Sequence, residues 1–123
     1  MKFSIDKQER YTVFTLNEDN LNSTLAPKLK SEFTLLSQEG IPNLIFDMSN
    51  IKIIDSAGLS SILIGDRAWK DLGSFVLTGV QPYVSRIIQI AKLDKMLVIV
   101  PTFQECLDYI EMEEIQRNLI EEE

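Results

Sequence analysis

Residues 44–59 have the sequence LIFDMSNIKIIDSAGL, and this stretch decides the fold. Residues 44–48 form a largely apolar run that gives way to polar residues, which is typical of a strand buried in the centre of a sheet. A second short apolar run, residues 51–54, leads into Asp55-Ser56-Ala57-Gly58. Residues 59–72 are then apolar at helical spacing. A buried strand followed by a helix predicts one repeat of an α/β fold.

The same two periodicities extend in both directions from this segment. Residues 3–16 alternate around a polar turn and predict a hairpin, while residues 25–36 have apolar side chains at helical spacing. The further elements expected are strands at 74–78 and 96–100 and helices at 82–91 and 103–110. Gly73 is expected to end the helix over 59–72, and Thr102 with Glu105 forms a capping box. The predicted order, ββαβαβαβα, indicates an α/β fold with a mixed, mostly parallel sheet and crossover helices.

The C-terminal tail differs from the rest of the chain in charge. The 123 residues have a net charge of −7, of which residues 111–123, with six Glu and one Arg, carry −5. We therefore divide the chain into a domain over 1–110 and an acidic helical extension or tail over 111–123. Two apolar stripes lie roughly 150° apart around the final helix, so that one straight helix cannot bury both in one core. The stripes are Phe103, Leu107 and Ile110, and Met112, Ile115 and Leu119.

The sequence is compatible with three structures for this tail. It is a frayed acidic helix, a kinked helix packed on its own domain, or a surface for a partner or for self-association.

Composition excludes several classes of function. The absence of histidine removes Ser-His and Cys-His nucleophile pairs and the zinc sets that contain histidine. The single Cys106 forms neither an internal disulfide nor a CxxC pair, which fits a reducing compartment. The acidic balance and the scattered cations disfavour nucleic acid. Neither phosphate-cradling glycine motif occurs, and no cofactor or metal site is expected.

The N-terminal residues lack the apolar core of a secretory signal, and the longest apolar run is far too short to span a bilayer. A soluble, cytoplasmic protein without direct membrane insertion is expected.

Candidate site residues follow the predicted parallel strands, where ligand sites collect. They are Asp47, the pair Asp55-Ser56, and the loop 79–82. Ser56 can cap the following helix, whose first N–H groups favour an anion, and Gly58 permits a close approach. The plainer alternatives are that Asp55 and Ser56 are a helix cap and that Asp47 is a strand-end carboxylate bonded to nearby loop N–H groups. A receiver-type phosphoacceptor role for Asp47 is disfavoured, because Mg²⁺ needs more oxygen ligands than Asp47 offers alone.

The segment FDMSNIKIIDSAGL strongly resembles the STAS domains, the family of bacterial anti-sigma factor antagonists and of sulfate-transporter tails. Further segments are similar to other parts of the family pattern, at 79–87, 91–95 and 103–107. The resemblance implies that Ser56 is the phosphorylatable serine of the antagonist branch. Unphosphorylated, such a domain binds an anti-sigma factor with a histidine-kinase-type ATPase fold, which also phosphorylates the serine, and a PP2C-type phosphatase reverses the modification.

The resemblance also implies a docking surface around this serine. Its expected members are Asn22, Asp55, Ser56, Ala57, Gly58 and Leu59. Asn22 departs from the family, which often has an aspartate there, and it keeps hydrogen bonding while losing the charge.

The leading interpretation is thus a non-enzymatic regulatory module, since no nucleophile has an activating base. The alternatives are a STAS-type structural subunit of a lipid-transport ATPase complex and a small-molecule or nucleotide sensor.

Overall fold

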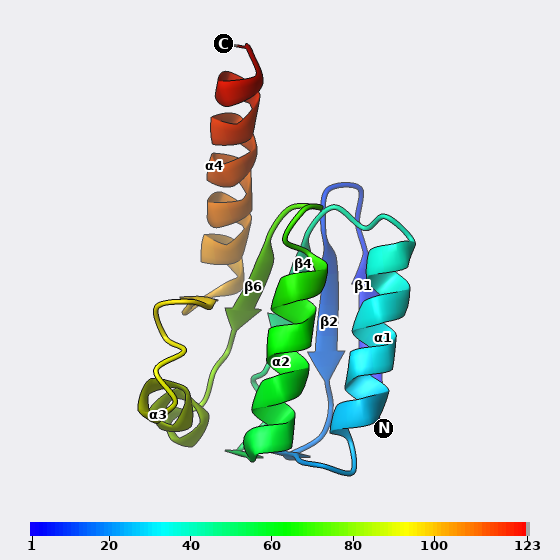
Figure 1. The fold of residues 1–123 in the computed structure, drawn as a ribbon, viewed down its shortest axis with the longest axis vertical. Coiled ribbons are helices and arrows are strands. Elements are labelled where there is room, and N and C mark those ends of the chain that lie inside the picture. The colour runs from blue at the N-terminus through cyan, green and yellow to red at the C-terminus, as the bar shows by residue number, and fades with distance from the viewer. Residues whose placement is uncertain (123) are drawn as a thin grey trace.

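The computed structural model describes residues 1–122, and its central layer is a five-stranded sheet with helices on both faces (Figure 1). The strands of this sheet, in spatial order, are β1 (Phe3–Lys7), β2 (Thr12–Leu16), β4 (Leu44–Asp47), β6 (Phe75–Thr78) and β7 (Val98–Val100). The helices are α1 (Ala26–Gln38), α2 (Ser56–Ala68), α3 (Pro82–Ile90) and α4 (Phe103–Glu122). Within the part described, no helix is both long and apolar enough to cross a membrane.

The sheet is mixed and mostly parallel, as predicted. β1 and β2 form the antiparallel hairpin, and β2, β4, β6 and β7 are mutually parallel. β4 is buried along its apolar residues because it lies between β2 and β6. The carboxyl ends of the parallel strands therefore meet at one edge, which is the lower end of the molecule in Figure 1.

A second, two-stranded sheet was not predicted. β3 (Asn20–Leu21) pairs in parallel with β5 (Ile53–Ile54), outside the main sheet. Residues 51–54, expected as a short apolar run and not counted as a strand, thus contain the strand β5 in their last two residues. This small sheet brings the segment before α1 beside the segment before α2.

The core has two parts because successive side chains of a strand point to opposite faces. On one face α1 and α2 cover an aromatic cluster in which Phe33 meets Phe14, Phe46 and Phe75 edge to face. Trp69 completes this cluster, fully buried, with its Nε1 donating to the Ile41 carbonyl at 2.9 Å. On the other face α4 packs on β4 and β6 through a smaller cluster, which consists of Ile45, Val76, Cys106 and Ile110.

α2 ends earlier than predicted, at Ala68 instead of Leu72. The buried Trp69 is its C-cap, and the chain then turns, with the N–H groups of Leu72 and Gly73 both donating to the Trp69 carbonyl at 3.0 Å. Gly73 is required there for space, since a Cβ would overlap the Pro42 carbonyl. It is therefore a site of close backbone approach and does not end the helix.

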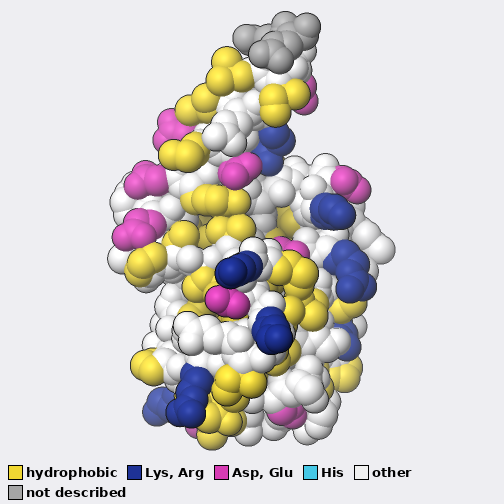
Figure 2. Space-filling view, turned by 60° about the vertical axis from the view of Figure 1, so that its left-hand side comes forward, with side chains coloured by type: hydrophobic (Ala, Val, Ile, Leu, Met, Phe, Trp, Pro, Cys, Tyr) yellow, Lys and Arg dark blue, Asp and Glu magenta, His cyan; other side chains and the backbone are white. Residues whose placement is uncertain are grey.

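α4 is one continuous helix that continues past the end of the sheet (Figure 1). Its predicted capping box is confirmed in one of its two bonds, because the Glu105 N–H donates to the Thr102 hydroxyl at 3.2 Å. Of the stripe expected in the core, Ile110 is buried, but Phe103 is exposed and Cys106 is buried in its place. The last turns stand clear of the body and carry hydrophobic side chains (Figure 2).

Candidate functional site

Ser56 is the first residue of α2 and lies at the end of the sheet where the parallel strands terminate. Its side chain is exposed, and its hydroxyl has no hydrogen-bond partner among residues 1–122. The hydroxyl is therefore free to be modified without loss of an internal contact.

Asp55, not Ser56, caps this helix. The prediction that Ser56 is the cap is wrong, because Asp55 occupies the extended position before the first turn and its Oδ1 accepts from the Gly58 N–H at 2.9 Å. The other oxygen, Oδ2, accepts from the Ser23 N–H at 3.2 Å. One carboxylate thus joins the start of α2 to the loop before α1.

Asn22 stabilises the same loop before α1 through its own side chain. Its Oδ1 accepts from the Thr24 and Leu25 N–H groups at 3.0 and 3.4 Å, which is an Asx turn leading into α1. The preceding Leu21 carbonyl accepts from the Asp55 N–H at 3.3 Å. Asn22 and Asp55, 33 residues apart in sequence, are therefore neighbours through the β3–β5 pairing, and the Asn22 amide oxygen already serves the local turn.

The six residues expected to form the docking surface differ in exposure. Asp55 and Ser56 are exposed, and Asn22 and Ala57 are partly exposed. The other two, Gly58 and Leu59, are buried. A Cβ at Gly58 would overlap the Leu21 carbonyl, so this glycine lets β3 lie directly against α2. Gly58 and Leu59 thus support the surface from beneath.

Asp47 is a strand-end carboxylate held by the adjacent loop. Its Oδ1 accepts from the Ser49 N–H at 3.0 Å, and Gly79, with φ of +69°, packs beside both residues. This is the plainer of the two interpretations of Asp47. Within residues 1–122, no cluster of three or more acidic, Cys or His side chains is arranged to hold a metal ion.

Cys106 lies close to Asp47, on the α4 side of the sheet. Burial raises the pKa of its thiol to about 11, and the charges of Asp47 and Glu105 act in the same direction. The thiol is therefore protonated at neutral pH and is not an activated nucleophile.

Three exposed apolar residues on β5, the strand that leads into α2, and on α3 were not part of the predicted surface. Ile53 lies on β5, and Tyr83 and Ile90 lie on α3, which packs against β5. The only signal for Ile53 is its alternation with the buried Ile54, which places it on the outer side of a strand. The apolar face at this end of the molecule is therefore wider than residues 55–59.

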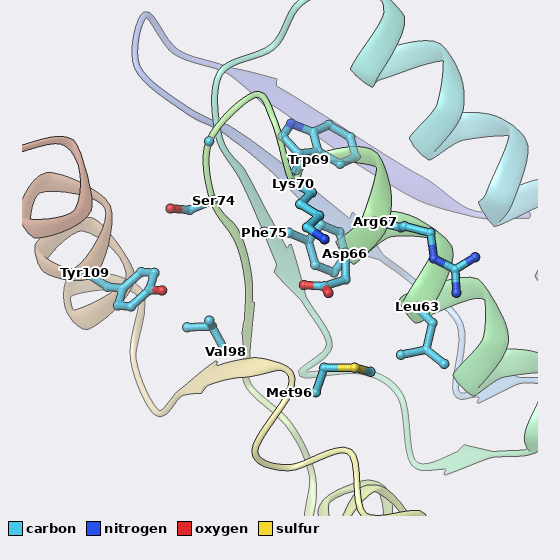
Figure 3. Close-up of a pocket in the computed structure, with 11 residues that line it drawn as sticks. Leu63, Asp66, Arg67, Trp69, Lys70, Ser74, Phe75, Met96, Val98 and Tyr109 are labelled. Atoms are coloured by element: carbon cyan, nitrogen blue, oxygen red, sulfur yellow. The ribbon is translucent and has the colours of Figure 1, made fainter. Parts of the chain in front are cut away.

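A separate cavity of about 390 Å³ lies at the opposite end of α2 (Figure 3). It is bounded by the last turns of α2, by β6 and β7, and by Tyr109 of α4. Burial raises the pKa of Asp66 there, with Lys70 opposing the shift, and burial together with Glu113 raises the pKa of Tyr109. This cavity is distinct from the surface around Ser56.

Comparison with known proteins gives one family and several structures of the same fold. The STAS domain family model matches residues 2–106. An anti-sigma-factor antagonist (STAS) domain protein from Planctomyces limnophilus has a TM-score of 0.80 at 21% identity, over 89% of this chain and 97% of that one. The anti-sigma factor antagonist SpoIIAA in its unphosphorylated form has a TM-score of 0.74 at 18% identity, over 89% and 96%. Bacillus SpoIIAA in its phosphorylated form has a TM-score of 0.67 at 17% identity, over 89% and 99%.

Proposed function

The chain belongs to the STAS domain family, as residues 46–59 predict, and we propose that it is an anti-sigma factor antagonist switched at Ser56. The observation that carries this proposal is the exposed Ser56 hydroxyl, free of internal bonds, at the first position of α2. A fold neighbour, SpoIIAA, exists in both unphosphorylated and phosphorylated forms. The proposed protein is a regulatory binding module without catalytic activity and acts in the cytoplasm in the control of transcription.

The proposed partners bind and modify the same surface. An anti-sigma factor with a histidine-kinase-type ATPase fold docks on Asp55, Ser56 and Ala57, with the exposed Ile53 as an apolar contact beside them. It releases its sigma factor on binding and phosphorylates Ser56 with ATP, and a PP2C-type phosphatase restores the binding form. Self-association through the C-terminal tail is a separate interaction.

Phosphorylation would switch binding by a local change of charge. A phosphate adds about −1.5 to −2 charge beside the Asp55 carboxylate. It replaces no internal hydrogen bond of Ser56, and the positive end of α2 tolerates an anion. The fold is therefore expected to survive, while the partner interface is lost through repulsion and desolvation.

The test combines phosphate transfer with binding. The protein is incubated with ATP and a candidate anti-sigma kinase encoded by a neighbouring gene, and the intact mass is measured. Wild type should gain one phosphate and Ser56→Ala none, while Ser60→Ala, one turn further along α2, should behave as wild type. Ser56→Asp should remain folded and lose partner binding, and Ser56→Ala should bind constitutively. If Ser56→Asp and Ser56→Ala bind the anti-sigma factor with equal affinity, the switch model is wrong.

A polar hollow at the strand ends supports a second candidate, a small-molecule sensor. Its volume is about 540 Å³, and it lies between the end of β2 and the loop after β4. The residues lining it are Lys2, Asn17, Glu18, Asp19, Ser49, Asn50 and Lys52. A thermal-shift screen of nucleotides and small anions tests this role. A hit that Lys52→Ala abolishes, with no phosphate transfer from any candidate kinase, would favour the sensor.

A further inference from the structure

The projecting part of α4 carries an unpartnered apolar stripe. Met112, Ile115 and Leu119, which we call the tail stripe, are 60%, 52% and 57% exposed. They point away from the sheet, since Cys106 and Ile110 occupy the opposite side of the same helix. The apolar residues are spaced i, i+3, i+7, which is the spacing of a helix–helix contact. Nothing within residues 1–122 covers them.

The electrostatics of this segment favour a cationic partner. The segment contains Glu111, Glu113, Glu114 and Glu121 against the single Arg117. Of these, Glu114 is already held by the Asn43 amide and by Arg10. The last turn of α4 has no basic residue, although the C-terminal end of a helix carries partial negative charge. Acidic side chains at a helix C-terminus oppose local stability, and a contact with cations would relieve this conflict.

α3 presents a stripe that matches the tail stripe in spacing and complements it in charge. Tyr83, Arg86 and Ile90, which we call the α3 stripe, also follow i, i+3, i+7. Tyr83 and Ile90 are 50% and 66% exposed, and Arg86 between them is exposed. Two further exposed cations, Lys92 and Lys95, follow α3 in the chain. In the α3 stripe two apolar residues, Tyr83 and Ile90, lie on either side of the Arg86 cation. This arrangement complements the tail stripe, which is apolar and is flanked by the Glu111 carboxylate.

The two stripes cannot meet within one molecule, but they are placed to meet between two. α3 and the projecting part of α4 lie at opposite ends of the molecule, both near the β7 edge of the sheet (Figure 1), with α3 packed into the core on the α1–α2 face and α4 packed on the other face. β7 is one of the two edge strands of the main sheet, and it borders the cavity of about 390 Å³ shown in Figure 3. On this side hydrophobic side chains run from the projecting helix towards the lower end, where some of the Lys and Arg side chains of this face also lie (Figure 2). A two-fold axis beside β7 is the arrangement that would bring each tail to the α3 of the other copy.

We propose that the protein forms a two-fold dimer in which the tail stripe of each copy packs on the α3 stripe of the other. The contact occurs twice and closes the assembly, as expected for an isologous interface. It also covers the edge strand β7, which otherwise exposes unpaired backbone groups. This dimer goes beyond the Ser56 switch and does not depend on it.

Sedimentation velocity of the full chain, over the micromolar to sub-millimolar range, tests the dimer. Wild type should show twice the monomer mass at high concentration. Changing Ile115 and Leu119 to Ser should give monomer at every concentration, and so should changing Tyr83 and Ile90 to Ser. Leu35→Ser, an equally exposed leucine on α1 at the far edge of the molecule, should leave the dimer intact. All substitutions are at exposed positions, so circular dichroism and the melting temperature should match wild type.

A charge exchange tests the choice of surface. Arg86→Glu and Glu111→Lys should each weaken the dimer at least tenfold, and the double variant should recover most of the affinity. A wild-type monomer throughout the range would overturn the proposal. A dimer lost with the tail variants but kept with the α3 variants would also overturn it, because that result assigns the contact to two tails packing on each other.

Discussion

Replacing Asp55 tests whether one carboxylate holds the candidate site together. Asp55→Ala removes the cap of α2, which is worth about 1 kcal/mol. It also removes the bond from the Ser23 N–H, for which the usual net value is about 1 kcal/mol. The free energy of unfolding should therefore fall by about 2 kcal/mol. Asp55→Asn separates the two bonds, since its amide oxygen can accept from the Gly58 N–H and asparagine is an equally good cap, whereas its NH2 group cannot accept from the Ser23 N–H and should cost about 1 kcal/mol.

Thermal and urea unfolding measure this difference. For a domain of this size 1 kcal/mol shifts the melting temperature by about 4 °C, so Asp55→Ala should melt about 8 °C below wild type. Asp55→Asn keeps the cap and loses only the bond from Ser23, so it should melt about 4 °C below wild type, and the urea m-value should be unchanged in both variants. If Asp55→Ala melts like wild type, the carboxylate does not hold the two segments together. If Asp55→Asn is as unstable as Asp55→Ala, the charge stabilises the helix and the hydrogen bonds do not.

Two further predictions concern buried positions. Gly58→Ala should lower the free energy of unfolding by about 2 kcal/mol in a urea titration, because its Cβ would meet Ile54 Cγ1 at 2.6 Å as well as the Leu21 carbonyl; a variant as stable as wild type would contradict this close approach. In the folded protein the pKa of the Cys106 thiol is raised from 9.0 to about 11. Above pH 9 the thiol therefore loses its proton in the unfolded chain before it does so in the folded protein, and the free energy of unfolding should fall. The loss should reach about 2–3 kcal/mol at pH 11. Cys106→Ala should remove this part of the alkaline slope in urea titrations from pH 8.5 to 11, and an unchanged slope would exclude the thiol as its source.

The main sheet was predictable because each of its central strands has a local signal. β2 alternates and β4 is an apolar run, and both patterns depend only on neighbouring residues. β3 and β5 have two residues each, too few to show a period. Their existence depends on pairing between Asn20–Leu21 and Ile53–Ile54, more than thirty residues apart. The hydrogen bond from the Ser23 N–H to Asp55 depends on this pairing. It could therefore not be predicted from the sequence.

The exchange of roles between Asp55 and Ser56 has a similar cause. Both side chains are good helix caps, and their adjacent positions differ only in which backbone N–H lies within reach. With Asp55 as the cap, that group belongs to Gly58, where the absence of a side chain lets β3 approach. The tertiary contact through Leu21 thus fixes the start of α2. As a result the serine hydroxyl is left free, which is what a modifiable residue requires.

The tail exposes apolar side chains because its sequence places two apolar stripes on different sides of one helix. Two apolar stripes roughly 150° apart require either a kink or the exposure of one stripe. Residues 103–122 contain neither Pro nor Gly, the usual causes of a kink, and α4 is continuous. The sheet can cover only the stripe that reaches it, so Ile110 is buried and Ile115 is exposed. The exposed stripe therefore follows from helix continuity, and the acidic residues around it keep it in water until a cationic surface such as the α3 stripe is brought against it.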